Sequence, residues 1–131
     1  MKKLTKEKII ARVRFDAMPT IQDIYLELIK RSSFNDFVGP RVANDLEANR
    51  DLWQGVLMTR TDTGITLRDL EHNYNNVNTL WILSSGKNDK ELEKLARTWS
   101  WDEQKWYTKD ESKSALGTGS TKYRILELWW D

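Results

Sequence analysis

The sequence predicts an α+β domain in which amino-terminal helices pack on one face of a single, mainly antiparallel sheet, with one further helix inserted between strands. Three observations lead to this prediction. Apolar residues recur at helical spacing through the first half of the chain. After residue 55, β-branched and aromatic residues gather in short runs that are typical of strands. The length of 131 residues suits one core, so we expect a single domain over residues 1–131.

Two helices are predicted before residue 31. In the first, Ile9, Ile10 and Val13 form a short apolar stripe. The second begins at Thr20 and Asp23, which have the spacing of a capping box. Behind this box the apolar residues are three and four positions apart: Ile21, Ile24, Tyr25, Leu28 and Ile29. We expect this whole stripe to face the core.

A third helix is predicted over about residues 40–55. Gly39-Pro40 is a start signal, because proline suits the first helical position. Apolar residues recur beyond it at near-helical spacing: Val42, Leu46, Trp53, Val56 and Leu57. The period then changes, and β-branched residues on both sides of Asp62-Thr63-Gly64 predict a hairpin turn.

The second half of the chain predicts two strands with a helix between them. Residues 78–85 (NTLWILSS) form a continuous apolar run, which is typical of a central strand covered on both faces. Asn88 and Glu91 have capping spacing and predict a helix of about ten residues. The final strand covers residues 122–131 (KYRILELWWD). Its alternation places Leu126, Leu128 and Trp130 on one face and Tyr123, Ile125, Glu127 and Trp129 on the other. The polar, glycine-bearing residues 110–121 before it predict the most mobile loop of the protein.

The segment TWSWDEQKWY, which ends at Tyr107, allows two interpretations. In one, a four-residue loop pairs Trp101 with Trp106, and the hairpin directs its tryptophans toward the core. In the other, a capping box at Ser100 makes residues 101–110 helical and scatters the rings. The sequence leaves both interpretations open, and it also leaves open whether the rings of this segment are core or surface.

Tryptophan is concentrated near the carboxyl end, where five of the seven lie between residues 99 and 130. We expect more aromatic surface on this sheet than its inner face can bury, and exposed apolar patches usually mark binding. Five residues are predicted to form a partner-binding outer face: Lys105, Tyr107, Tyr123, Arg124 and Trp129. Aromatic rings interleaved with cations suit either a partner protein's hot spot or stacked bases.

The composition excludes several kinds of chemistry. The chain has no cysteine, which excludes disulfides, thiolate nucleophiles and cysteine-based metal sites. The basic residues 1–14 are not followed by the apolar run of a signal peptide, and no stretch approaches the roughly 18 apolar residues of a membrane span. We therefore expect a soluble cytoplasmic protein with no membrane partner. The net charge of +1 argues against a dedicated duplex DNA-binding protein.

Motifs for catalysis and for cofactors are weak. His72 is the only histidine and has no recognised metal-ligand spacing around it. Residues 117–122 (GTGSTK) fit neither the dinucleotide fingerprint nor the P-loop. Acid-x-lysine patterns at residues 103–105 and 111–113 occur in metal-dependent nucleases, but two such patterns are expected by chance in a chain rich in lysine and glutamate. The sequence favours a protein with no metal, no cofactor and no catalytic residues, and leaves enzymatic activity undecided.

Two hypotheses about function follow. The first is a non-catalytic binding protein that docks on a protein partner through its aromatic-rich carboxyl-terminal sheet face, as an inhibitor or regulator. The alternative is single-stranded nucleic-acid or nucleotide binding, with bases stacked on tryptophan and tyrosine and phosphates held by lysine and arginine. The identity of the partner and the oligomeric state are not determined by the sequence.

Overall fold

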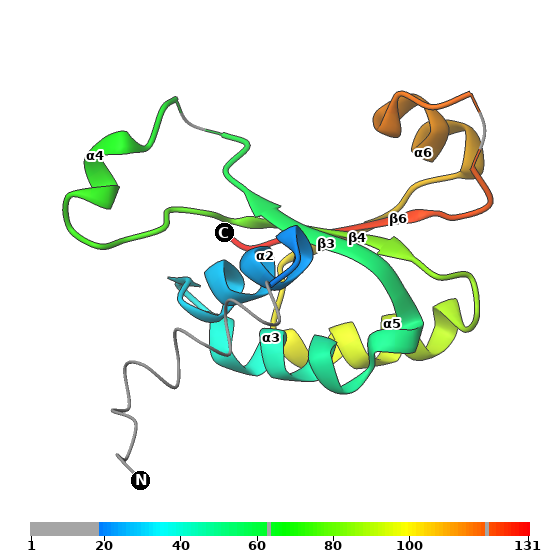
Figure 1. The fold of residues 1–131 in the computed structure, drawn as a ribbon, viewed down its shortest axis with the longest axis horizontal. Helices are drawn as coiled ribbons and strands as arrows, with labels where there is room; N and C mark the ends of the chain where they lie inside the picture. The colour runs from blue at the N-terminus through cyan, green and yellow to red at the C-terminus, as the bar shows by residue number, and fades with distance from the viewer. Residues whose placement is uncertain (1–18, 63, 120) are drawn as a thin grey trace, which may run out of the picture.

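The computed structural model describes residues 19–62, 64–119 and 121–131 and has the predicted α+β fold (Figure 1). The helices are α2 (Ile21–Lys30), α3 (Gly39–Ala48), α4 (Leu67–Leu70), α5 (Asp89–Ala96) and α6 (Lys109–Leu116). The strands are β1 (Ser33–Phe34), β2 (Phe37–Val38), β3 (Trp53–Thr59), β4 (Thr79–Ser84), β5 (Glu103–Trp106) and β6 (Ile125–Trp129). The predicted helix around Ile9 and Val13 lies outside the described residues.

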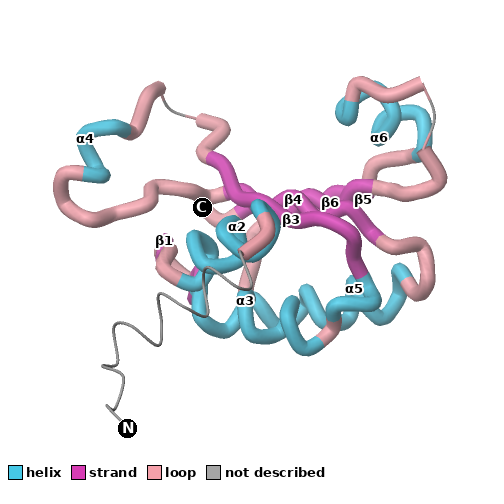
Figure 2. The backbone as a smooth tube through the Cα atoms, viewed as in Figure 1, coloured by secondary structure: helices cyan, strands magenta, loops and turns pink. Residues whose placement is uncertain are grey.

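The main sheet has the strand order β3-β4-β6-β5, and each neighbouring pair is antiparallel. The prediction of a single sheet omitted one small element, because β1 and β2 form a separate two-stranded ribbon between α2 and α3. Figure 2 shows the main sheet nearly edge-on, with α3 and α5 in a layer beneath it. Helix α5 is inserted between β4 and β5, as predicted, and the Asn88 side chain caps it by accepting a hydrogen bond from the Glu91 amide.

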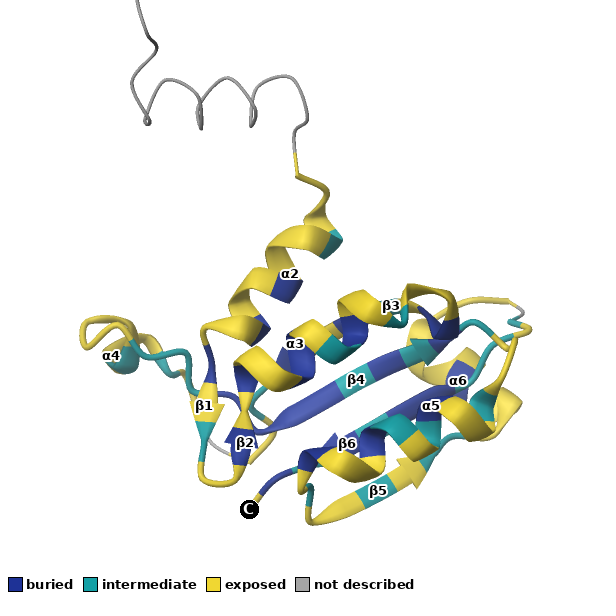
Figure 3. Ribbon diagram, turned by 90° about the horizontal axis from the view of Figure 1, so that it is seen from below, coloured by how far each residue is buried: buried dark blue, intermediate teal, exposed yellow. Residues whose placement is uncertain are grey.

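The face of the sheet toward α3 and α5, called here the inner face, carries the core. The strand register places one inner-face row at Val56, Ile82, Leu126 and Trp106, and the next at Met58, Leu80, Leu128 and Gln104. The leucines and isoleucine of β4 and β6 in these rows are fully buried, and Trp130 continues their face beyond β6. Figure 3 shows this side of β4 and β6 largely dark blue. Alternation along the last strand was therefore predicted correctly.

Helix α2 begins where the sequence predicted, with the complete Thr20 and Asp23 capping box. The prediction that its apolar stripe faces the core is wrong, because Leu26 and Ile29 are the buried residues. Ile21 is 74% exposed and Ile24 is 50% exposed. At about 100° per residue, the apolar side chains span roughly 200° of the helix. One helix in contact with β3 and α3 cannot cover so wide an arc, and half of it faces solvent.

The side chain of Gln22 fixes α2 to the free edge of the sheet. Its Nε2 donates to the Val56 carbonyl at 2.8 Å, and its Oε1 accepts from the Val56 amide at 3.0 Å. Both backbone groups would otherwise be unpaired at an edge strand. Gln22 therefore completes the ladder of β3 in place of a further strand.

Replacing Gln22 with leucine should lower the free energy of unfolding by about 2 kcal/mol, since two hydrogen bonds to part-buried backbone are lost. Gln54→Leu, on an exposed position of the same strand, is the matched control and should change stability by less than about 0.5 kcal/mol. Urea denaturation of both variants measures the difference. Equal midpoints would show that the amide does not support the edge.

The helix predicted over residues 40–55 is shorter than expected. Helix α3 ends at Ala48, a turn of 3-10 helix covers Arg50–Leu52, and β3 begins at Trp53. The Trp53 indole N–H donates to the Leu46 carbonyl at 2.9 Å, which turns the chain back along α3. Pairing with β4 outweighs the helical spacing of the apolar residues beyond this point.

The hairpin turn predicted at Asp62-Thr63-Gly64 is also wrong, because β3 pairs with β4 across the long loop of residues 60–78. Polar side chains hold the base of this loop. Arg60 pairs with Asp62 at 2.7 Å and donates to the Asn76 side chain at 3.0 Å. The Asn76 side-chain amide in turn donates to the Asp69 carboxylate of α4 at 3.0 Å. The contact between Arg60 and Asn76 joins residues far apart in the sequence, so the turn residues alone do not predict it.

Neither interpretation of TWSWDEQKWY is confirmed. A 3-10 turn ends at Trp99, Ser100 takes a left-handed conformation with φ 57°, and β5 then pairs with β6 rather than with residues before it. The structure decides what the sequence left open, since the three tryptophans of this segment belong to the core and Tyr107 lies at the outer side of the sheet. Trp99 is buried, and Trp101 and Trp106 pack partly buried against the core.

Residues 110–121, predicted as a mobile loop, contain most of helix α6. The Thr108 side chain accepts from the Glu111 amide, and the Glu111 carboxylate accepts from the Thr108 amide, which makes a second capping box. Gly117 ends the helix in a left-handed conformation. Both signals were present in the sequence and were outweighed there by the polar composition.

Candidate functional site: the outer face of the sheet

The opposite side of the sheet, called here the outer face, is covered at one end by α6, the one described helix that lies over this side. Figure 1 shows α6 on the side away from α3 and α5. The register places Leu57, Trp81, Glu127 and Lys105 in one row across the four strands. The prediction that β4 is central is confirmed, but the prediction that both its faces are covered is not. Trp81 and Leu83 are only half-buried.

An apolar groove, here called the outer groove, runs over this face between α2 and the end of α6. Its first lobe, of about 300 Å³, lies between Tyr25 of α2 and Leu57 of β3. A second lobe of about 340 Å³ extends toward Tyr107. A third, more open lobe of about 550 Å³ reaches Tyr123. Leu116 lines all three lobes, so the lobes adjoin one another around this side chain.

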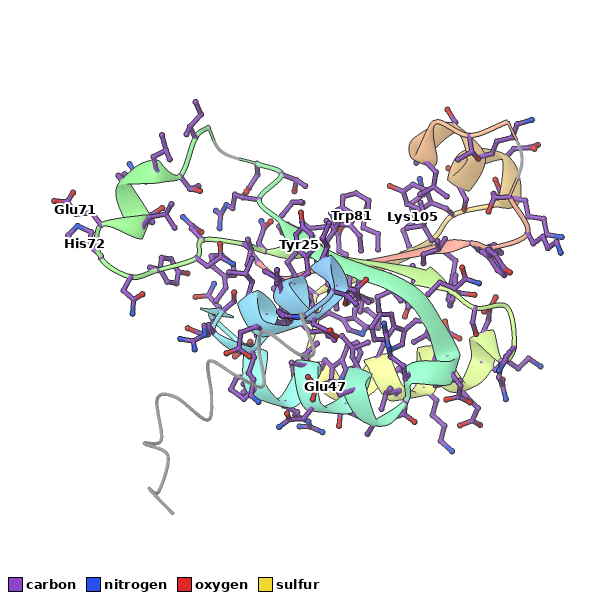
Figure 4. The ribbon with its side chains drawn as sticks, viewed as in Figure 1. Tyr25, Glu47, Glu71, His72, Trp81 and Lys105 are labelled. Carbon is purple, nitrogen blue, oxygen red and sulfur yellow. The ribbon has the colours of Figure 1, made fainter. Side chains whose placement is uncertain are left out.

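Trp81 forms the floor of the groove. Its indole N–H donates to the Thr59 hydroxyl at 2.8 Å, and its ring meets Tyr107 edge to face at 6.2 Å between centroids. Figure 4 shows Trp81 on the side of the sheet away from α3, with Tyr25 beside it and Lys105 farther toward α6. With its only polar atom satisfied within the protein, Trp81 offers an apolar surface to a ligand.

A polar cluster borders the groove at β5 and β6. The Tyr107 hydroxyl donates to Glu127 at 2.7 Å, and the Lys105 ammonium lies 4.5 Å from the centroid of the Tyr107 ring. Lys105 also pairs with Glu111 of α6 at 3.0 Å. This pair and the capping box hold the pKa of Glu111 below its usual value. The cluster therefore fastens α6 to the sheet and fixes one wall of the groove.

Burial, together with the hydrogen bond to Glu127, raises the pKa of Tyr107 to about 12 from the ordinary 10.0. The fold thus favours the neutral phenol, and this stabilisation is complete below pH 10 and is lost as the pH rises through about 12. Absorbance titration should show a phenol step near pH 12 that is absent from Tyr107→Phe. In Glu127→Gln, which removes the negative charge, this step should shift to lower pH. A wild-type difference spectrum that is complete by pH 10.5 would contradict this assignment.

The five predicted site residues do not converge on one spot. Lys105 and Tyr107 lie together at the groove, and Tyr123 lines its third lobe. The Arg124 guanidinium lies 5.0 Å from the Trp106 ring centroid and donates to the Tyr107 carbonyl, so it faces the inner side. Trp129 is half-buried and pairs across the sheet with Thr79, away from the groove.

Most residues that line the groove were not predicted as site residues, and four of them are central to it: Tyr25, Leu57, Trp81 and Leu116. One signal could have found Trp81. In an antiparallel strand with Leu80 and Ile82 facing the core, alternation sends Trp81 and Leu83 to the other face. The other three cannot be assigned from local sequence, because their exposure depends on where α2 and α6 lie against the sheet.

The described residues hold no second candidate site of the kinds that the sequence raised. Over residues 19–62, 64–119 and 121–131, no three histidine, aspartate or glutamate side chains are grouped as metal ligands. The lysine of the first acid-x-lysine pattern, Lys105, pairs with Glu111 of the second pattern. His72 is exposed at the far end of the β3–β4 loop (Figure 4). In the same described ranges, no helix is long and apolar enough to cross a membrane.

Comparison with known proteins found no counterpart. No protein-family model, curated protein or solved structure matches this chain.

Proposed function

We propose that this protein is a non-catalytic binding protein that docks on a protein partner through the outer groove and the exposed side of α2. The observation that carries the proposal is an apolar surface that the described part of the chain, residues 19–62, 64–119 and 121–131, leaves uncovered. It consists of six exposed side chains, Ile21, Ile24, Tyr25, Leu28, Leu57 and Leu116, around the half-buried ring of Trp81. Contiguous apolar surfaces of this kind with a polar rim usually serve as protein contacts.

The groove has the features of a hot-spot pocket. Its floor is an indole ring, its walls are leucine and isoleucine, and the paired Lys105 and Glu111 stand at its rim. Aromatic anchors inside apolar pockets carry most of the binding energy at protein interfaces. We infer that docking regulates or inhibits the partner. The cysteine-free composition fits the cytoplasm as the compartment in which this occurs.

The nucleic-acid alternative has less support on this surface. Base stacking needs open ring faces beside free cations. Tyr107 is hydrogen-bonded and covered on one side by Lys105, which is paired with Glu111. Arg124 faces the other side of the sheet, against Trp106.

A photo-crosslinking amino acid placed at Leu57 tests the proposal in cells of the native host. We expect a discrete protein adduct from position 57 and none from Lys94, an exposed position on α5 in the opposite layer. The second variant Leu116→Asp, made on the position-57 background, should remove the adduct while the circular dichroism spectrum stays unchanged. Absence of any adduct at position 57, or equal adducts at both positions, would refute the docking surface.

A further inference from the structure

We propose that the partner on this surface is a second copy of this chain, paired by a two-fold axis so that α2 of each copy enters the outer groove of the other. This inference rests on the proposed function and names its partner. A two-fold interface requires a surface that is complementary to itself. The outer face meets this requirement, since it presents a ridge and a groove side by side.

The ridge is the exposed side of α2. Ile24 and Leu28 are one turn apart and exposed, at roughly 150° from the buried Leu26 and Ile29 by helical geometry. Tyr25 belongs to both features, because it lies beside the ridge and lines the groove. Two copies related by a two-fold axis can therefore place each Ile24 and Leu28 ridge over the other copy's groove.

The exposed apolar area suits a stable dimer. Six side chains contribute to it, with exposed fractions from 37% to 74%. Taking about 200 Å² for one large side chain, they leave roughly 550 Å² of apolar surface per copy. Covering both copies would bury about 1,100 Å² from these side chains alone, and the polar rim brings the total into the range of roughly 1,200–2,000 Å² found for stable interfaces.

Charge favours the same pairing. The net charge of +1 means that two copies do not repel each other strongly. Helix α2 carries Asp23 in its first turn and Lys30 in its last turn. In an antiparallel pair the acidic end of one α2 lies toward the basic end of the other, and the two helix dipoles also oppose each other favourably.

Sedimentation velocity of the full chain from 1 to 100 µM tests the dimer. We expect the wild type to dimerise in this range, and Ile24→Asp to weaken the association at least 100-fold, since each dimer would then bury two carboxylates. Ile65→Asp is the matched control. It makes the same substitution on the β3–β4 loop, at a residue 85% exposed and away from the groove, and it should dimerise like the wild type.

A wild type that stays monomeric at 100 µM, or a dimer that Ile24→Asp leaves intact, would overturn the inference. The mass of the position-57 adduct separates this failure from failure of the proposed function. An adduct of twice the chain mass supports the second copy. An adduct with a different protein, from a chain that stays monomeric, overturns the dimer and leaves the docking surface standing. With no adduct, both proposals fail.

Discussion

The Gly39→Ala variant should lose about 3 kcal/mol or more of folding stability, because a methyl group at this position has no room. A Cβ on Gly39 would lie 2.1 Å from the Ile29 carbonyl oxygen and 2.2 Å from the Ser32 carbonyl oxygen. Both atoms belong to the backbone at the end of α2, so no side-chain rotation relieves the contact. Only a shift of α2 away from α3 would make space.

The matched control is Gly119→Ala. No heavy atom lies within 4 Å of a Cβ built on Gly119, so its stability should change by less than about 0.5 kcal/mol. Urea denaturation of both variants measures the contrast. If Gly39→Ala unfolds at the wild-type midpoint, the close approach of the two helices is not a feature of the fold. Because α2 carries the ridge of the docking surface, Gly39→Ala should also weaken the proposed pairing.

The Trp130→Ala variant should lose about 3–5 kcal/mol, the usual cost of removing a fully buried large aromatic side chain. Trp130 is 0% exposed, packs edge to face on Phe37 at 4.8 Å between centroids, and donates its indole N–H to the Trp99 carbonyl at 3.1 Å. Its removal leaves a cavity and an unpaired buried carbonyl. Such a loss approaches the whole stability of many small domains.

The neighbouring residue provides the control. Trp129 is half-buried on the other side of β6, and Trp129→Ala should cost less than about 1.5 kcal/mol. Trp130→Phe keeps the test informative if the alanine variant does not fold, with an expected loss of about 1–3 kcal/mol. Denaturation curves followed by far-ultraviolet circular dichroism give all three values. Equal losses at positions 129 and 130 would contradict the assignment of these two rings to opposite faces.

The concentration of tryptophan near the carboxyl end is thus mainly a property of the core. Trp99 and Trp130 are buried, and Trp101 and Trp106 pack partly buried against the same cluster. The rings that were expected on the outside, Tyr107, Tyr123 and Trp129, are neither sealed nor fully exposed. The uncovered apolar surface comes instead from aliphatic residues of α2, β3 and α6, around Trp81.

The sequence by itself determined the elements that depend on near neighbours. The capping box of α2, the Asn88 cap of α5, the central strand β4 and the alternation of β6 are local patterns, because caps and strand alternation involve residues only a few positions apart. These local patterns were also sufficient to predict the α+β class. The capping box of α6 was equally local, and it was missed only because composition was given more weight than the cap.

Only the tertiary structure decided the rest. Which side of the wide apolar arc of α2 is buried depends on where Gly39 and Gln22 hold the helix against α3 and β3. The partner of β5 is β6, nearly twenty residues later, and β3 closes on β4 across the loop of residues 60–78. Apolar spacing in the sequence indicates which residues need to be buried, but the residues that pack against them belong to segments distant in the chain. The outer groove is assembled from α2, α6 and the strands β3, β4 and β6, so it exists only in the folded protein.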